Sequence, residues 1–150
     1  MIKVMLDEGA IMPTKAHADD AGFDLYTPKS FYMEGSVWKN NIYITTMNVQ
    51  SLTIDTGVHI EIPKGYVGMI KSKSGLNVKC GLITEGVIDA GYTGRIVVKM
   101  YNLSQYAHEF HAGDKIAQLV IMPISTEALE LVDKLEDTER GANGFGSSGR

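Results

Sequence analysis

Short runs of alternating apolar and polar residues dominate the chain, and turn-forming residues separate them. At the N-terminus, Ile2, Val4 and Leu6 occupy every second position. This alternation predicts a first strand over residues 1–6. Runs of the same type follow at residues 23–26, 51–62, 67–70, 87–98 and 116–121. Because Thr56-Gly57 interrupts the second of these runs, we expect two short strands there. Many short strands between turn signals favour an all-β sandwich or barrel.

Three stretches depart from this pattern. Ser74 is a suitable cap for a short helical turn through Lys79, and Gly81 suits the position that follows a helix. Residues 30–47 are rich in aromatic side chains, with a turn expected at 39–41. Residues 129–135 fit a strand or a helix equally well. We interpret residues 1–139 as one domain and the glycine-rich residues 140–150 as an arm.

Composition limits the classes of function. The 150 residues are 44% hydrophobic and 21% charged, as expected of a globular domain with one core. A net charge of −4 argues against general nucleic-acid binding but allows a local basic pocket for phosphates. No apolar run is long enough to span a bilayer, and no signal-peptide pattern opens the chain. The single cysteine, Cys80, has no partner for an internal disulfide, which favours a cytoplasmic location.

The stretch from Gly86 to Gly94 carries the most suggestive chemistry. Val87-Ile88 predicts a strand and 96–98 its return, so Asp89 and Tyr92 lie at the mouth of a hairpin. A carboxylate at the end of a buried strand is suited to activating a water, and the hairpin offers backbone N–H and C=O groups to a ligand. The alternative is an ordinary Asp-Ala-Gly turn with a packed tyrosine.

Other polar positions are ambiguous by themselves. The segment 71–75 combines cations, hydroxyls and a helix start, which suits either an anion site or a solvated basic loop. Asp24 is alone in an apolar strand and is expected at the surface unless it serves a site. Gln118 lies among apolar residues and fits an exposed edge. In the tail, glycines allow backbone N–H groups to approach phosphates, and Phe145 is suited to stacking on a base.

Five short motifs follow one another along nearly the whole chain. They are Ala21-Gly22-x-Asp24-Leu25, Ser74-Gly75-Leu76, Gly86-Val87-Ile88-Asp89-x-x-Tyr92-x-Gly94, Gly113-Asp114-Lys115-Ile116-Ala117-Gln118 and Arg140-Gly141-x-x-Gly144-Phe145-Gly146-Ser147-Ser148-Gly149. In this order they resemble the five motifs of the trimeric dUTP pyrophosphatases (dUTPases). Each motif is short, and the specificity of the resemblance lies in their order.

The resemblance implies a fold and a reaction. The implied fold is a jelly-roll-like distorted β-barrel with one short helix and a glycine-rich C-terminal arm that closes over an active site. The implied assembly is a homotrimer with sites shared between subunits. The implied reaction is hydrolysis of dUTP to dUMP and pyrophosphate with Mg²⁺ on the triphosphate, which lowers dUTP and supplies dUMP for thymidylate synthesis.

The resemblance also implies roles for individual residues. Asp89 matches the carboxylate that activates the attacking water, and Asp24 matches one that organises the metal–water region indirectly, through water. Tyr92 matches the ring against the deoxyribose, Arg140 the clamp on the γ-phosphate, and Phe145 the ring over the uracil. The full set of implied substrate-binding residues is Lys73, Ser74, Gly75, Ile83, Val87, Ile88, Tyr92, Val97, Gln118, Arg140, Phe145, Gly146 and Ser147.

Three features depart from the family pattern, and one of them is Asn143 in place of a common glycine of the arm. The family's second motif usually opens with arginine, whereas this chain has Lys73, a point charge without the bidentate fork. Residues 30–47 are longer than the family's usual connection.

Two alternative functions stay open at this point. A dCTP deaminase of the same superfamily would use a catalytic glutamate near the third motif, where this chain has Glu85. A dUTP-sensing regulatory protein would bind a protein partner, for which the aromatic segment 30–47 is the candidate surface.

Overall fold

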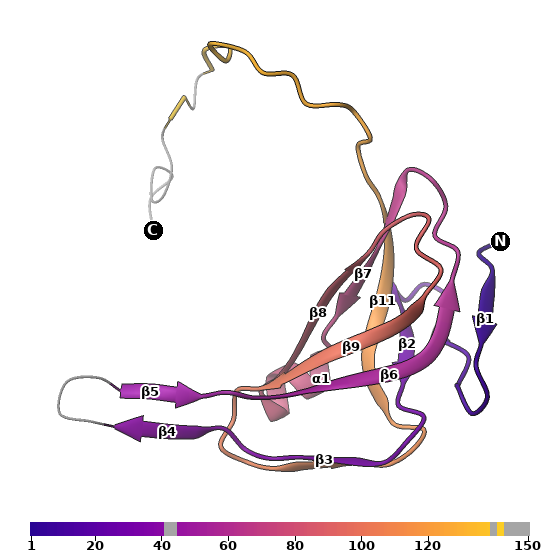
Figure 1. Cartoon of the computed structure of the whole chain (residues 1–150), viewed down its shortest axis with the longest axis vertical. Helices are drawn as coiled ribbons and strands as arrows, with labels where there is room; N and C mark the ends of the chain where they lie inside the picture. Colours follow the sequence, from indigo (N-terminus) through magenta and orange to yellow (C-terminus); the bar gives the residue numbers. More distant parts are fainter. Residues whose placement is uncertain (41–44, 139–140, 143–150) are drawn as a thin grey trace.

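The computed structural model describes residues 1–40, 45–138 and 141–142. Within these ranges the chain forms eleven strands and one short helix (Figure 1). The elements are β1 (Val4–Leu6), β2 (Gly22–Tyr26), β3 (Phe31–Met33), β4 (Val37–Asn40), β5 (Thr45–Asn48), β6 (Gln50–Ile60), β7 (Tyr66–Lys71), α1 (Ser74–Cys80), β8 (Leu82–Ile88), β9 (Arg95–Asn102), β10 (His108–Phe110) and β11 (Lys115–Pro123).

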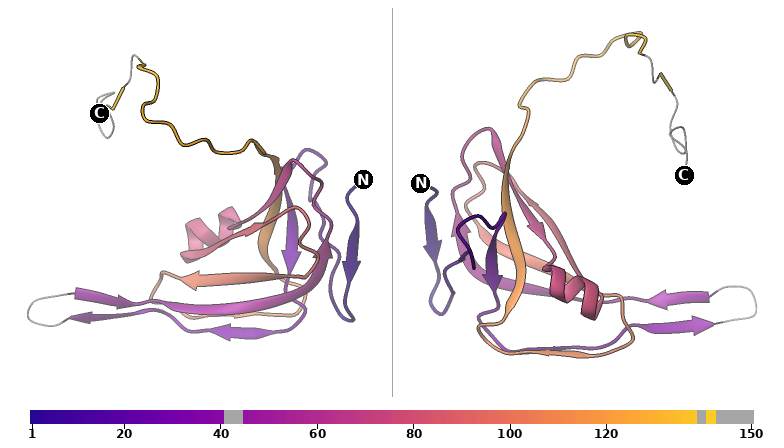
Figure 2. Two further views of the ribbon diagram at one scale, coloured as in Figure 1. Left: turned by 45° about the horizontal axis from the view of Figure 1, so that its top comes forward. Right: turned by 180° about the vertical axis from the view of Figure 1, so that it is seen from behind.

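Seven of the strands make one curled antiparallel sheet. Its order is β1-β6-β9-β8-β7-β11-β2, and the sheet bends round so that β2 and β11 face the β6–β9 pair (Figures 1 and 2). Two further pairs, β10–β3 and β4–β5, complete the strand pairing of the described residues. The expectation of an all-β barrel with one short helix is confirmed.

The core lies inside this curl and follows the two-residue period of the strands. On β9, Ile96, Val98 and Met100 are fully buried, whereas Val97 and Tyr101, on the opposite face of the strand, are exposed. Leu25, Ile70, Leu82, Ile116 and Leu119 bring the other strands to the same apolar cluster. The alternation seen in the sequence therefore fixes which face of each strand points inward.

The segment 51–62 does not form two strands as expected. It contributes one long strand, β6, and the Thr56-Gly57 pair forms an irregularity within it. The register against β9 shifts between Asp55 and His59, and Gly57 has a φ of 66°. A glycine in left-handed backbone is the usual means of inserting a bulge without ending a strand.

The helix begins one residue earlier than a Ser74 cap would allow. Lys73 occupies the N-cap position, its side chain makes no capping hydrogen bond, and Ser74 is the first helical residue. Gly81 ends the helix with a left-handed φ of 67°, as expected.

The segment 30–47 divides between two pairs of strands. β3 pairs with β10, while β4 and β5 form a hairpin that projects from the body (Figure 1). β4 ends at Asn40, and residues 41–44, which include the end of the predicted turn, lie outside the described residues.

The prediction of a strand or helix over residues 129–135 is wrong. From Met122 to Thr138 every side chain is exposed, and beyond Pro123 the chain forms no helix or strand through Thr138. This segment leaves the body at the end of β11 (Figure 2, right). It carries apolar side chains, including Leu129 and Leu131, that are fully exposed among the described residues. In the described ranges, no helix has the length and apolar character needed to cross a bilayer.

Candidate active site

Asp24 is not a surface residue. It lies on β2 opposite Gln118 of β11, and only 4% of its area is exposed. Each carboxylate oxygen contacts a different ammonium group. The Nζ of Lys73 contacts Oδ1, and the Nζ of Lys115 lies 2.6 Å from Oδ2. A buried carboxylate is stable only when it is paired in this way.

The pairing keeps Asp24 ionised. Burial acts to raise the pKa of its carboxyl, but the hydrogen bonds from Lys115 and Lys73 outweigh burial, so the pKa lies below its ordinary value. The hydrogen bond to Asp24 also raises the pKa of Lys115. At neutral pH this cluster therefore carries two positive charges and one negative charge at the end of the sheet where α1 begins.

Gln118 lies beside this cluster and is not at an edge. β11 is flanked by β7 and β2, and the Gln118 Nε2 donates a hydrogen bond to the Ser72 carbonyl at 3.0 Å. Gly22 makes room for it, since a Cβ at that position would stand 2.7 Å from Gln118 Oε1. The first motif, with Asp24 on β2, and the fourth, with Gln118 on β11, are therefore neighbours in the sheet. The second motif, at the start of α1, lies beside them.

The start of α1 completes this group. Lys73 precedes the helix, and Ser74 and Gly75 are exposed in its first turn. Hydroxyl, backbone N–H and ammonium groups therefore lie together at this point. Phosphate oxygens accept hydrogen bonds from donors of these three kinds.

The hairpin between β8 and β9 opens towards its turn. The two strands pair only from Leu82–Asn102 to Thr84–Met100. Further on, β8 pairs with β7, and β9 pairs with β6. The two strands diverge, so between them the backbone N–H and C=O groups make no ladder contacts with each other.

Side chains at the opening are arranged as a half-exposed apolar surface. Val87 and Val97 are 60% and 42% exposed, and Ile83 is half-buried. Ile88 faces the core, so only its backbone can reach a ligand.

The turn at the mouth of this hairpin carries Asp89 and Tyr92. Asp89 is exposed, and among the described residues its carboxylate has no hydrogen-bond or ion-pair partner. Tyr92 donates from its hydroxyl to the Arg95 carbonyl at 3.0 Å. Its ring lies over Gly94, where a Cβ would overlap the ring and its hydroxyl. The Tyr92 ring can therefore occupy this position only because residue 94 is a glycine.

The two groups lie at opposite ends of the sheet of one chain. Asp89 follows Ile88, which pairs with Gly68, whereas Lys73 follows Lys71, which pairs with Glu85. The ladder between these ends has four residue pairs, and its three steps alone span about 10 Å at the rise of a strand. Figure 1 shows the same separation, with α1 at one end and the β8–β9 connection at the other. One chain alone does not bring Asp89 to the lysine cluster.

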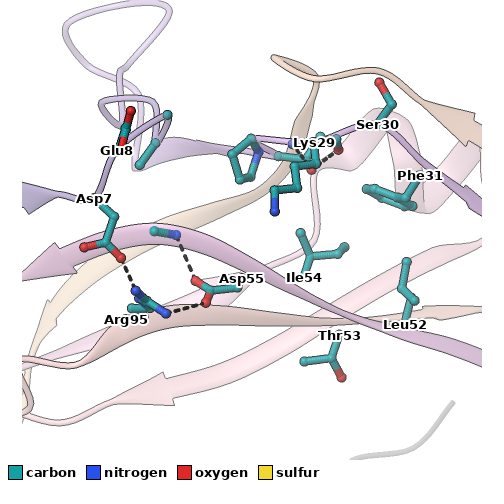
Figure 3. Close-up of a pocket in the computed structure, with 15 residues that line it drawn as sticks. Asp7, Glu8, Lys29, Ser30, Phe31, Leu52, Thr53, Ile54, Asp55 and Arg95 are labelled. Atoms are coloured by element: carbon teal, nitrogen blue, oxygen red, sulfur yellow. Dashed lines mark hydrogen bonds and ion pairs between the residues drawn. The ribbon is translucent and has the colours of Figure 1, made fainter.

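A cavity of about 480 Å³ lies elsewhere, between the N-terminal segment, β6 and the 27–31 segment (Figure 3). Asp7, Asp55 and Arg95 are among its lining residues. No described residue of the predicted site lines it. Apart from the buried Asp24 and Ile88, the described residues of the predicted site are partly or fully exposed outside this cavity.

Lys115 is the residue of this site that the sequence reasoning did not single out. It belongs to the fourth motif, but its contact with Asp24 depends on the register of β11 against β2. Of the other predicted residues, Arg140, Phe145, Gly146 and Ser147 lie outside the described residues.

Comparisons with known proteins agree with the order of the motifs. A family model described as dUTPase matches residues 8–149. The chain belongs to the dUTPase family. The deoxyuridine 5'-triphosphate nucleotidohydrolase of Clostridium novyi is 38% identical over 146 residues, which cover 95% of this chain and 94% of that protein. The mouse (Mus musculus) protein of the same name is 36% identical over 148 residues, covering 98% and 83%.

Solved dUTPase structures share the fold. The Staphylococcus bacteriophage 80alpha dUTPase with dUpNHpp has a TM-score of 0.85 and 30% identity, and the match covers 100% of this chain and 99% of that chain. The dUTPase of phage phi11 of S. aureus, whose species-specific insert has been visualised, has a TM-score of 0.77 at 29% identity, covering 92% and 99%. The curled sheet is therefore the jelly-roll-like barrel of the dUTPases, as the motifs implied.

Proposed function

We propose that this chain hydrolyses dUTP to dUMP and pyrophosphate. The observation that carries the proposal is the opened β8–β9 hairpin, with the unpaired, exposed Asp89 carboxylate at its mouth. Its dUTPase relatives carry the activity in their names. The product dUMP is the precursor for thymidylate, so the same reaction removes dUTP and supplies that precursor.

Asp89 is the proposed general base. The carboxylate takes a proton from a water whose oxygen forms a bond to the α-phosphorus, and the bond from that phosphorus to the bridging oxygen breaks, so pyrophosphate leaves. A carboxylate with no hydrogen-bond or ion-pair partner among the described residues is suited to this role.

The hairpin is the proposed binding site for the base and the sugar of the nucleotide. The unpaired backbone edges between β8 and β9 are suited to the hydrogen-bonding edge of uracil, and a 5-methyl group on a base held there would clash with the hairpin. Tyr92, held over Gly94, would press on the sugar where a 2′-hydroxyl would stand.

Ser74, Gly75, Lys73 and Gln118 are the proposed phosphate-side residues. They lie together beside Asp24, on the end of the sheet where donors are concentrated. The arm residues Arg140, Phe145, Gly146 and Ser147 remain predictions of the motif alone.

Mg²⁺ is the proposed cofactor, and the residues fit only an indirect site. Both Asp24 oxygens are taken by lysines, and the described residues contain no cluster of three histidine, cysteine or acidic side chains that could hold a metal. When bound, the ion would neutralise charge on the triphosphate. Asp24 would then act through water. A phage phi11 dUTPase structure is described as coordinating a structural Mg(II) ion.

A homotrimer with shared sites is the proposed assembly. The separation of Asp89 from the lysine cluster within one chain supports a site completed by a second subunit. The exposed apolar segment 124–138, which leaves the body, supports an arm that crosses to a neighbour. We keep the division into a 1–139 domain and a 140–150 arm as part of this proposal.

The alternatives have weaker support. Glu85, the candidate acid of a deaminase, is engaged by Lys71 at 2.9 Å on the adjacent strand, whereas Asp89 has no described partner. A protein partner through residues 30–47 stays a prediction, with the projecting β4–β5 hairpin and its exposed Trp38 as the surface to delete. A cytoplasmic location is likewise proposed only from the single free cysteine, Cys80.

A panel of nucleotides tests the proposed function. Pyrophosphate release is measured with dUTP, UTP, dTTP and dCTP, and ammonia release is measured with dCTP. The proposal expects pyrophosphate from dUTP far above the other three. Ammonia from dCTP without pyrophosphate from dUTP would instead identify a deaminase.

A further inference from the structure

The bulge in β6 brings a histidine under the turn that carries Asp89 and Tyr92. In the β6–β9 ladder, Asp55 pairs with Val97 and His59 pairs with Arg95. Four steps along β6 therefore match two steps along β9, so β6 contains two extra residues. Bulges of this kind redirect side chains beside active sites, and this one changes the direction of β6 at the start of β9.

The bulge is held by specific contacts. The Thr56 hydroxyl donates to the Ile96 carbonyl at 2.7 Å in the core, and the Gly57 N–H donates to Asp55 Oδ1 at 2.9 Å. From the other side, the Asp7 N–H donates to the Gly57 carbonyl at 2.9 Å. Because hydrogen bonds fix the bulge on both sides, one of them buried in the core, the position of His59 is well defined.

The His59 ring contacts the turn directly. Its Nδ1 lies 2.8 Å from the carbonyl oxygen of Thr93, and only 16% of its side chain is exposed. A carbonyl can only accept, so Nδ1 carries the hydrogen and donates it. The Nε2 faces Asp7 Oδ1 at 3.4 Å, without hydrogen-bond geometry. The ring is thus held between the N-terminal segment and the turn.

Arg95 holds the other end of the same turn. Its guanidinium lies 2.5 Å from Asp7 and 3.5 Å from Asp55 (Figure 3). The hydrogen bond to Asp7 raises the pKa of the guanidinium and lowers that of the Asp7 carboxyl. The Arg95 carbonyl accepts the Tyr92 hydroxyl. The Tyr92 hydroxyl is therefore hydrogen-bonded to a residue whose own side chain is held by two carboxylates.

The turn has little internal support. Its residues are mostly exposed, and its one described internal backbone hydrogen bond runs from the Tyr92 N–H to the Asp89 carbonyl at 3.1 Å. Gly91, with a φ of 92°, adds backbone freedom. The contacts that fix its orientation come from outside, at Thr93 and at Arg95.

We propose that His59 is a positioning residue that holds the Asp89–Gly94 turn through its hydrogen bond to the Thr93 carbonyl, and thereby holds the Tyr92 ring against the sugar. The inference rests on the proposed function, because it assigns sugar discrimination to Tyr92. His59 touches neither the nucleotide nor the reacting water. None of the five motifs contains His59.

The sharpest readout is the discrimination between dUTP and UTP. A variant that only unfolds part of the protein lowers kcat/KM for both nucleotides by the same factor, so their ratio is unchanged. A variant that loosens the turn lets the tyrosine ring yield to a 2′-hydroxyl, so the ratio falls.

The test uses two substitutions at position 59 and one matched control. His59→Leu removes the donor. His59→Asn keeps an amide N–H close to the place of Nδ1. The control is Thr53→Val, also on β6, which removes a polar contact to Lys99 of β9 at 3.4 Å away from the turn.

His59→Leu is expected to lower the dUTP-to-UTP ratio of kcat/KM about three- to tenfold, the range set by one lost hydrogen bond. His59→Asn is expected to stay within about twofold of wild type, and Thr53→Val to match wild type. In amide hydrogen exchange, His59→Leu is expected to speed exchange in residues 89–94 and not in residues 98–102.

A wild-type ratio in His59→Leu, or an equal fall in Thr53→Val, would overturn the proposal, as would unchanged exchange in the turn. If the wild-type protein itself fails to discriminate between the nucleotides, the proposed role of Tyr92 fails, and the exchange measurement still decides whether His59 holds the turn.

Discussion

Lys73 stands where the dUTPase pattern has arginine, and the structure shows what accompanies the change. A guanidinium can contact both oxygens of one carboxylate, but the ammonium of Lys73 contacts only Oδ1 of Asp24. Lys115 takes the other oxygen. Two lysines thus pair with the carboxylate that one arginine fork could hold, and both ammonium groups lie beside the proposed phosphate site.

Replacing Lys73 should weaken substrate binding more than turnover, because Asp89 and the attacking water are not touched. Lys73→Ala is expected to raise KM about ten- to a hundredfold, the effect of losing one charge-assisted hydrogen bond of roughly 1.5–3 kcal/mol. Lys73→Arg should retain activity. Steady-state kinetics with dUTP give both numbers. A normal KM for Lys73→Ala together with a raised KM for Lys71→Ala would assign the phosphate contact to Lys71 instead.

Acid should destabilise the protein through Asp24. Its folded-state pKa lies below the ordinary 3.8, so its pairing contributes full stability above that value. The contribution is lost as the pH falls from there through the lower folded-state pKa. Urea midpoints between neutral pH and about pH 3 should therefore fall on the acid side. Asp24→Asn should start from a lower midpoint and show a flatter fall; an equally steep fall in that variant would contradict the assignment.

Among single residues, the order of motifs predicted site roles for Asp24, Asp89, Tyr92 and Gln118 from the sequence. It did not locate Lys115 as a partner of Asp24. That contact depends on how β11 registers against β2, and register is a property of strand pairing that a single strand does not display.

Among the elements, the hairpin of β8 and β9 is the one on which the proposed dUTP hydrolysis depends. The absence of a side chain at Gly94 leaves room for the Tyr92 ring of this hairpin. A methyl group there would overlap the Tyr92 ring. Gly94→Ala should displace the ring and lower the dUTP-to-UTP ratio of kcat/KM about tenfold, as expected when a well-placed contact is lost.

The matched comparison is Tyr92→Ala, which removes the ring itself. Since both changes act through the same ring, adding Gly94→Ala to Tyr92→Ala should cost little more than Tyr92→Ala alone. Additive losses in the double variant would show that Gly94 acts by another route.

Element boundaries were predictable where alternation was regular and less so where local chemistry was ambiguous. β7, β9 and β11 were expected from their apolar runs. β6 was expected as two strands because Thr56-Gly57 resembles a break, yet its ladder continues after the bulge. Residues 129–135 have strand-like or helix-like apolar spacing, but the part of the chain that the structure describes leaves their side chains exposed.

At the scale of the whole molecule, the placement of the two groups predicts an oligomer. Light scattering should report about 49 kDa, three times the 16.4 kDa chain. Deleting residues 124–150 should reduce the mass towards one chain and abolish dUTP hydrolysis, because both the apolar segment and the predicted arm are removed. A fully active monomer of the intact chain would contradict shared sites.

The sequence predicted the kind of fold and the reaction, and it predicted shared sites only through the resemblance to the dUTPases, not through the placement of Asp89 and Lys73 in one chain. That placement follows from the antiparallel pairing of β7 with β8, which sends Asp89 and Lys73 beyond opposite ends of one ladder. Motif order along a chain carries no information about which subunit each motif serves.

The most direct test of the account is pyrophosphate release from dUTP by Asp89→Asn. Asparagine keeps the shape of the side chain but cannot take a proton from water at neutral pH. We expect turnover to fall about 10²- to 10⁴-fold, the usual cost of losing a general base, while dUTP still binds with near wild-type affinity in calorimetry. Turnover close to wild type in Asp89→Asn would contradict the central claim.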